Sequence, residues 1–111
     1  MKKRLPTKVR VGLAEYSITI GDHDLAKENA GSVGMCYPST KKIWLADGQQ
    51  LPCLAQTLWH ELLHAGAYEY STHYVTEPDE EYVVDINSHI LCQLLRDNPE
   101  LGAWTLFAVT S

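Results

Sequence analysis

The sequence lacks an apolar stretch long enough to cross a membrane, and it has no surplus of basic residues. The basic start, Met1 to Arg4, is not followed by the apolar segment of a secretory signal. Fourteen acidic residues outnumber nine basic ones, which gives a formal net charge of -5. Nucleic-acid binding depends on clustered Lys and Arg. We therefore expect a protein that works with neither a membrane nor a nucleic acid.

Cysteine is also scarce, since the chain has only Cys36, Cys53 and Cys92. An odd number of cysteines cannot pair completely within one chain, and an export signal is missing. We therefore expect reduced thiols and a cytoplasmic location. Cys36 and Cys92 are interpreted as small buried hydrophobic residues.

The length and the hydrophobic pattern predict one α+β domain over residues 1–111. Apolar residues alternate in the first half, as in strands, and follow helical spacing in the second half. We expect a small antiparallel or mixed β-sheet packed on two main helices. Residues 22–29 fit a short helix or a loop, and the apolar residues 101–109 are expected to pack on the core. The predicted strands are 8–13, 16–20, 33–37 and 42–46, the last two forming a hairpin.

The first main helix is predicted to begin near Asp47 and to end near Tyr68. Asp47 and Gln50 have the spacing of a capping box, and Pro52 suits a first turn. At 100° per residue, an apolar face lies opposite a face with polar and reactive residues. The apolar face comprises Leu51, Leu54, Leu58, Leu62 and Ala65, and the opposite face comprises Cys53, Gln56, His60 and His64.

The second main helix is predicted from the capping-box spacing of Thr76-Glu77-Pro78-Asp79, and it runs to about Arg96. Asn98-Pro99 ends it. Its apolar stripe comprises Val83, Ile86, Ile90 and Leu94, and another side carries Glu81, Asp85, Ser88 and Cys92 with His89 near its edge.

The segment His60-Glu61-Leu62-Leu63-His64 places two imidazoles one turn apart on the polar face of the first helix. Zinc takes nitrogen, sulfur or oxygen ligands, and a catalytic site combines three protein ligands with water. A carboxylate beside the metal can take a proton from the water and deliver it to a leaving amine. The pattern predicts a zinc site with His60 and His64 as ligands and Glu61 as general base.

The third ligand has to come from outside this segment. The metzincin pattern would need glycine at 67 and histidine at 70, where Ala67 and Tyr70 stand. Glu81 and Asp85 share one face of the second helix, although a small shift in helix phase would exchange Glu81 with Glu80. The candidates are Glu80, Glu81, Asp85, His73 and His89.

The motif followed by Glu81-Tyr82-Val83-Val84-Asp85 resembles the gluzincin pattern, in which the glutamate of ExxxD completes HExxH. The resemblance implies Glu81 as the third ligand and Asp85 as the acceptor that orients a ligand histidine. The hairpin and both helices together resemble the minimal zincins of ImmA/IrrE type found in phages and prophages. A zinc metallopeptidase with a protein or peptide substrate is implied. The partner segments of larger members have no room here, so their targets are not expected.

Substrate contacts are also suggested by the pattern. In zincins a strand beside the site commonly pairs with an extended peptide, and residues 42–46 are the candidate. A plain core strand is an equal interpretation of the same residues. A donor for the developing oxyanion would come from the residues near the end of the first helix or from the second helix. The candidates are Tyr68, Tyr70, His73, Tyr74 and His89.

Two hypotheses of different classes follow. The first is zinc-dependent hydrolysis of a peptide, and a non-peptide amide or ester would use the same acid–base chemistry. The second is a non-catalytic interaction protein of a phage or prophage that keeps a structural zinc. In that case a fourth protein ligand, such as His73 or Cys53, would close the coordination shell.

Overall fold

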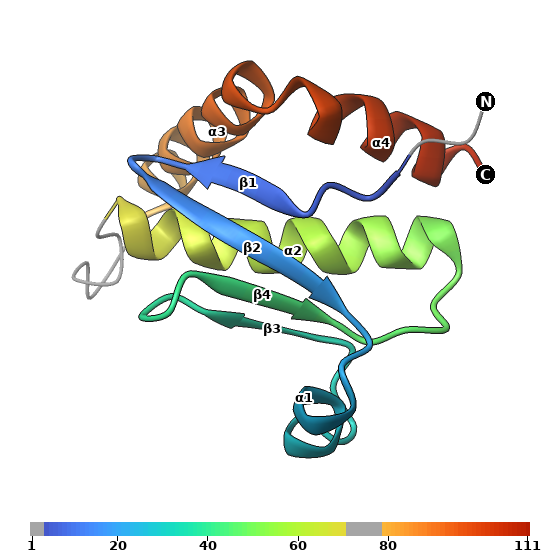
Figure 1. The fold of residues 1–111 in the computed structure, drawn as a ribbon. Coiled ribbons are helices and arrows are strands. Elements are labelled where there is room, and N and C mark those ends of the chain that lie inside the picture. The colour runs from blue at the N-terminus through green and yellow to red at the C-terminus, as the bar shows by residue number, and fades with distance from the viewer. Residues whose placement is uncertain (1–3, 71–78) are drawn as a thin grey trace.

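The computed structural model describes residues 4–70 and 79–111, which form a four-stranded sheet and helices beside it (Figure 1). The strand order is β1-β2-β4-β3. The β1–β2 and β3–β4 pairs are antiparallel, whereas β2 and β4 are parallel. The predicted α+β class with a mixed sheet is thereby confirmed. The strands are β1 (Lys8–Val11), β2 (Ala14–Ile20), β3 (Gly34–Tyr37) and β4 (Lys42–Leu45).

The connection from β2 to β4 explains the parallel pair, because parallel neighbours need a crossover. The chain leaves β2, forms the short helix α1 (His23–Glu28), and returns through β3 before it enters β4. Asp22 caps α1 by accepting a hydrogen bond from the backbone of Leu25. Of the two interpretations of residues 22–29, the helix is the one observed.

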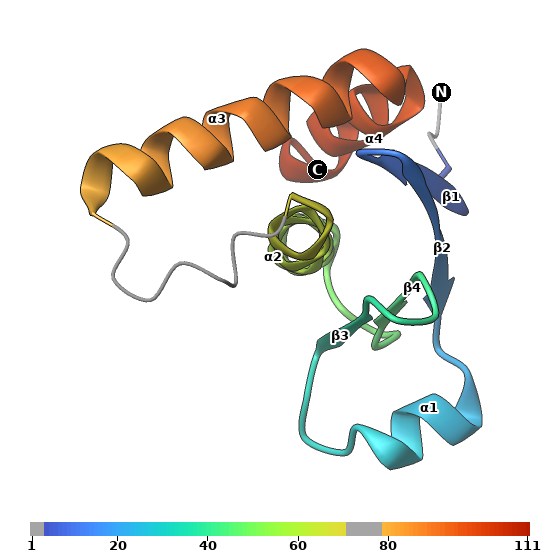
Figure 2. The ribbon, with the colours of Figure 1, turned by 90° about the vertical axis from the view of Figure 1, so that its left-hand side faces the viewer.

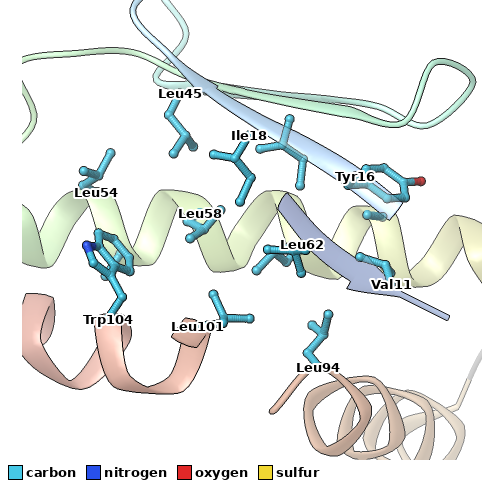
Figure 3. Close-up of a cluster of buried hydrophobic side chains, with 14 of the residues drawn as sticks. Val11, Tyr16, Ile18, Leu45, Leu54, Leu58, Leu62, Leu94, Leu101 and Trp104 are labelled. Carbon is cyan, nitrogen blue, oxygen red and sulfur yellow. The ribbon is translucent and has the colours of Figure 1, made fainter. Parts of the chain in front are cut away.

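Helix α2 (Leu51–Glu69) lies between the sheet and the other long helices, as Figure 2 shows end-on. The predicted apolar face is confirmed, since Leu54, Leu58 and Leu62 are buried against the sheet (Figure 3). His60 and His64 are exposed on the other side. The leucine face therefore fixes the direction in which the histidines point.

Helices α3 (Glu80–Asp97) and α4 (Pro99–Val109) cover the side of α2 away from the sheet (Figures 1 and 2). The sequence predicted that residues 101–109 pack on the core, and Leu101 and Trp104 are indeed buried. Their helical form was not predicted. Within residues 4–70 and 79–111, no helix is both long and apolar enough to cross a membrane.

Both predicted capping boxes are wrong in detail. The N-cap of α2 is Gln50, which makes no side-chain cap hydrogen bond, and the chain turns before it at Gly48 with φ 79°. The N-cap of α3 is Asp79, whose carboxylate accepts from the backbone of Tyr82 at 2.8 Å. The capping hydrogen bond of Asp79 thus marks the start of α3, whereas α2 starts after the turn at Gly48 without a side-chain cap. Residues 76–78 of the second motif lie outside the described residues.

Among the described strands the edges of the sheet are β1 and β3, so of the two interpretations of residues 42–46 the core strand is the one observed and the edge strand is not. β4 is central because it pairs with both β2 and β3. The outer side of β1 is covered by side-chain amides of α3 and the residue after it. The backbone N–H of Arg10 donates to Asn98 Oδ1 at 2.7 Å, and that of Gly12 donates to Gln93 Oε1 at 3.0 Å.

Candidate metal centre

Two histidines and a glutamate gather on α2. The Nε2 atoms of His60 and His64 are 3.2 Å apart. Together with the Glu61 carboxylate, their ligand atoms all lie within 4.8 Å of one another. Across residues 4–70 and 79–111, this is the one group of three His, Cys, Asp or Glu side chains close enough to hold a metal ion. The structure therefore brings together all three residues predicted from the motif.

The separation of the two imidazole nitrogens fits a tetrahedral metal. Zn–N bonds of about 2.0–2.1 Å at a tetrahedral angle would place two nitrogens about 3.3 Å apart. The observed Nε2–Nε2 distance is 3.2 Å, and the rings meet edge to face at 71°. Imidazole also suits other late first-row cations. The three side chains could therefore hold a metal ion, and their geometry does not select which ion.

Glu61 differs from the histidines because only 7% of it is exposed. This burial raises the pKa of its carboxyl, and charge on His60 and His64 acts in the opposite direction. The burial comes from strand β3, which approaches α2 at Gly34. A Cβ at position 34 would lie 2.7 Å from Thr57 Cγ2 and 3.1 Å from Glu61 Oε2. Glycine is therefore required where the strand meets the carboxylate.

The three residues line a groove between α2 and the edge strand β3. On the His64 side lies a hollow of about 480 Å³, and on the His60 side lies a second of about 490 Å³. Both hollows share Gly34, His60 and Glu61, so the groove continues past the motif in both directions. The first hollow is also lined by Met35, Cys36, Pro38, Ala67 and Tyr68, and the second by Gly31, Ser32, Val33, Gln56 and Thr57.

A charged cluster lies beside the first hollow, at the end of α2. The Lys41 ammonium is 2.6 Å from Glu69 Oε2 and 4.8 Å from the centre of the Tyr68 ring. The Tyr16 hydroxyl donates to Glu69 Oε2 at 2.7 Å. Burial and the Glu69 carboxylate raise the pKa of Tyr16 above its ordinary value. The cluster joins the β3–β4 turn, strand β2 and the wall of the hollow.

The cysteines behave differently from one another. Burial, followed by the charges of Glu61 and Glu69, raises the pKa of the Cys36 thiol to about 12. Among the described residues, Cys36 does not belong to the group of side chains close enough together to hold a metal ion. Cys36 is half-buried, whereas Cys92 is exposed because α3 packs through a different face. The interpretation of Cys92 as a buried residue is therefore wrong.

The acidic residues predicted on α3 lie apart from the motif. Glu80, Glu81 and Asp85 are exposed in the first half of α3, which projects beyond α2 in Figure 2. The helix buries residues only in its second half, within the described chain. None of these carboxylates belongs to the group formed by the motif. Glu81 as third ligand and Asp85 as its supporting acceptor stay predictions.

The predicted oxyanion donors are separated in the structure. His89 packs edge-on against Tyr70, with ring centres 5.1 Å apart, and lines a different hollow with Arg96. Tyr68 lines the groove itself. His73 and Tyr74 lie outside the described residues.

Gly34 in the groove and Lys41 beside it were not predicted as functional residues from the sequence. Gly34 falls within the predicted strand 33–37, where a glycine is itself a signal of close backbone approach. Lys41 carries no local signal, since its partners lie on β2 and α2.

Comparison with family models, curated proteins and solved structures found no match. The resemblance to gluzincins therefore rests on the motif and on the spacing of residues in this chain.

Proposed function

We propose that the protein is a zinc-dependent hydrolase, specifically a metallopeptidase that acts on a protein or peptide in the cytoplasm. The observation that carries this proposal is the convergence of His60 Nε2 and His64 Nε2 at 3.2 Å beside a buried Glu61. These groups line an open groove and are not enclosed in the core. A substrate can therefore reach them.

Glu61 is the proposed general base. When bound, zinc would lower the pKa of a coordinated water to about 7 and polarise a carbonyl. Glu61 accepts the proton of the attacking water and then delivers it to the leaving nitrogen. Burial raises the pKa of its carboxyl, while charge on His60 and His64 acts in the opposite direction. His60 and His64 hold the ion, and by resemblance Glu81 is the proposed third ligand.

The groove supports an extended peptide as substrate. Strand β3 forms one wall and, among the described residues, pairs on one side only, with β4. An extended chain can add to such an edge through backbone hydrogen bonds. Side-chain amides from Gln93 and Asn98 occupy the opposite edge, at β1. The β3 edge, next to Glu61, is therefore the edge at which an extended substrate chain can pair.

Metal analysis of the purified full chain tests the site. We expect about one zinc per chain in the wild type and in Glu61→Gln, and much less in His60→Ala and Glu81→Ala. His23→Ala is the matched control, because His23 is an exposed histidine on α1. Equal zinc in wild type, His60→Ala and Glu81→Ala would overturn the site.

Cleavage of fluorescein-labelled casein tests the reaction. Glu61→Gln should retain zinc and lose about 10²–10⁴-fold in rate, the usual contribution of a general base. Undiminished cleavage by Glu61→Gln would show that the assigned mechanism is wrong. Stable zinc binding without cleavage of casein or of a random peptide library would favour the non-catalytic interaction protein instead.

A further inference from the structure

We propose that the hollow on the His64 side of the groove binds a bulky apolar side chain of the substrate. We call it the Tyr68 hollow, and this inference rests on the proposed function. The proposed metal-binding residues form part of its wall, since His60, Glu61 and His64 all line it. A side chain in the hollow therefore belongs to a residue next to the bond that Glu61 helps to cleave.

The lining of the Tyr68 hollow selects for apolar groups. Apart from the motif itself, it consists of Gly34, Met35, Cys36, Pro38, Ala67 and Tyr68. Among residues 4–70 and 79–111, the lining therefore contains no Lys, Arg or Asp, and no Glu besides Glu61. A charged side chain would lose water there without gaining an ion pair. An apolar one gains from leaving water, and a volume of about 480 Å³ leaves room for an aromatic ring.

The hollow on the other side of the motif has a different character. Ser32 and Gln56 line it together with Val33, Thr57 and two glycines, so it offers the hydroxyl of Ser32 and the amide of Gln56. The groove is thus asymmetric about Glu61. It favours a large apolar residue on the Tyr68 side of the cleaved bond and a small or polar residue on the other side.

The Tyr68 side chain, which forms one wall of the hollow, is held in place by charged residues outside the hollow. Lys41 lies 4.8 Å from the centre of the Tyr68 ring, within the range of a cation–π contact. Its ammonium is fixed in turn by Glu69, whose carboxylate also accepts from Tyr16. A wall that is already in place loses little entropy when a ligand binds. Lys41 is therefore a positioning residue for the hollow.

A series of alkyl hydroxamates tests the hollow with a binding readout. Acetohydroxamate, butanohydroxamate and hexanohydroxamate share one zinc-chelating group and differ only in the alkyl chain. Calorimetry on the zinc-loaded full chain should show affinity rising about fourfold for each methylene that enters the hollow. Lys41→Met should reduce this rise.

Ala67→Phe tests where the alkyl chain binds. Ala67 lines the hollow, so a phenyl group there should fill it and remove the dependence on chain length. Ala103→Phe, at an exposed position of α4, adds the same group elsewhere and should keep the dependence. If Ala67→Phe fails to fold, as judged by circular dichroism, Met35→Ala replaces it and should weaken the dependence from the β3 side.

The outcomes of these binding experiments distinguish a failure of this inference from a failure of the proposed function. Binding of acetohydroxamate with no gain for longer chains would overturn the Tyr68 hollow and leave the zinc site intact. The same gain in Ala67→Phe or Met35→Ala as in wild type would also overturn it. Failure of every hydroxamate to bind the zinc-loaded protein would count against the proposed function itself.

Discussion

At position 34 a single hydrogen atom takes the place of a side chain between β3 and the Glu61 carboxylate. We expect Gly34→Ala to destabilise the protein by about 1–3 kcal/mol, the usual cost of overpacking. The added Cβ would lie 2.7 Å from Thr57 Cγ2, on a buried and β-branched side chain that yields little. Urea denaturation measures the loss of stability, and casein cleavage should fall because Glu61 is displaced.

A second substitution separates the clash from other effects. Thr57→Ser removes Cγ2 and keeps the hydroxyl that donates to Gln49 Oε1 and the Cys53 carbonyl. The double variant Gly34→Ala/Thr57→Ser should therefore be more stable than the two single effects predict together. Purely additive effects would show that the strand and helix do not meet as closely as described.

For the residues of the candidate metal centre, the sequence predicted their chemical roles better than it predicted which residues surround them. His60, Glu61 and His64 share a local pattern, and the leucines on the opposite side of the helix fix its orientation. Burial of Glu61 was not predictable, because it depends on Gly34 of another element. Lys41 was missed for the same reason.

Among the elements, α3 and β1 are joined by a set of polar side chains. Gln93 Nε2 donates to the Arg10 carbonyl and to Asp97 Oδ2, each at 3.0 Å. Asp97 also accepts from Arg96 at 2.8 Å, and hydrogen bonds from Arg96 and Gln93 lower the pKa of Asp97 to about 2. The ionised carboxylate thus holds Gln93 in the orientation that covers the β1 edge.

This arrangement predicts how stability depends on pH. The pKa of Asp97 is lower in the folded protein, so its contribution is complete above the unfolded value of about 3.9 and is lost as pH falls through about 2. Asp97→Asn should lower the urea midpoint at pH 7, and the difference from wild type should shrink between about pH 4 and pH 2.

Asp24→Asn serves as the control for that experiment, since Asp24 is fully exposed on α1. It should leave the urea midpoint nearly unchanged at every pH. A difference between Asp97→Asn and wild type that stays constant down to pH 2 would contradict the role of the charge.

The type of each element was predictable from the sequence, but which elements lie side by side was less predictable. Alternation located all four strands within a few residues, and helical spacing located α2 and α3. Strand order was not predictable, because the parallel pairing of β2 with β4 joins segments far apart in sequence. For the same reason the sequence could not decide whether residues 42–46 form an edge strand or a core strand. In α4, apolar residues occur nearly all round, so the pattern did not distinguish a helix from an extended tail.

For the whole molecule, the core and the candidate metal centre occupy opposite sides of α2. The buried cluster reaches from the sheet through Leu58 and Leu62 to Leu94 and Leu101 (Figure 3). The exposed histidines contribute nothing to that cluster. This separation implies that the protein folds without metal, unlike a zinc finger, in which the metal supplies the folding energy.

Zinc should nevertheless stabilise the folded state, because only that state holds His60 and His64 in register. Free zinc at about 100 times its Kd adds about 2.7 kcal/mol, which raises the Tm of a domain this size by about 10–20 °C. Chelator-treated protein should keep its helical circular dichroism and melt at the lower temperature. His64→Ala should lose the zinc-dependent rise, and Glu81→Gln should reduce it if α3 supplies the third ligand. Unfolding by chelator at 25 °C, or a zinc-dependent rise that persists in His64→Ala, would contradict this division between core and site.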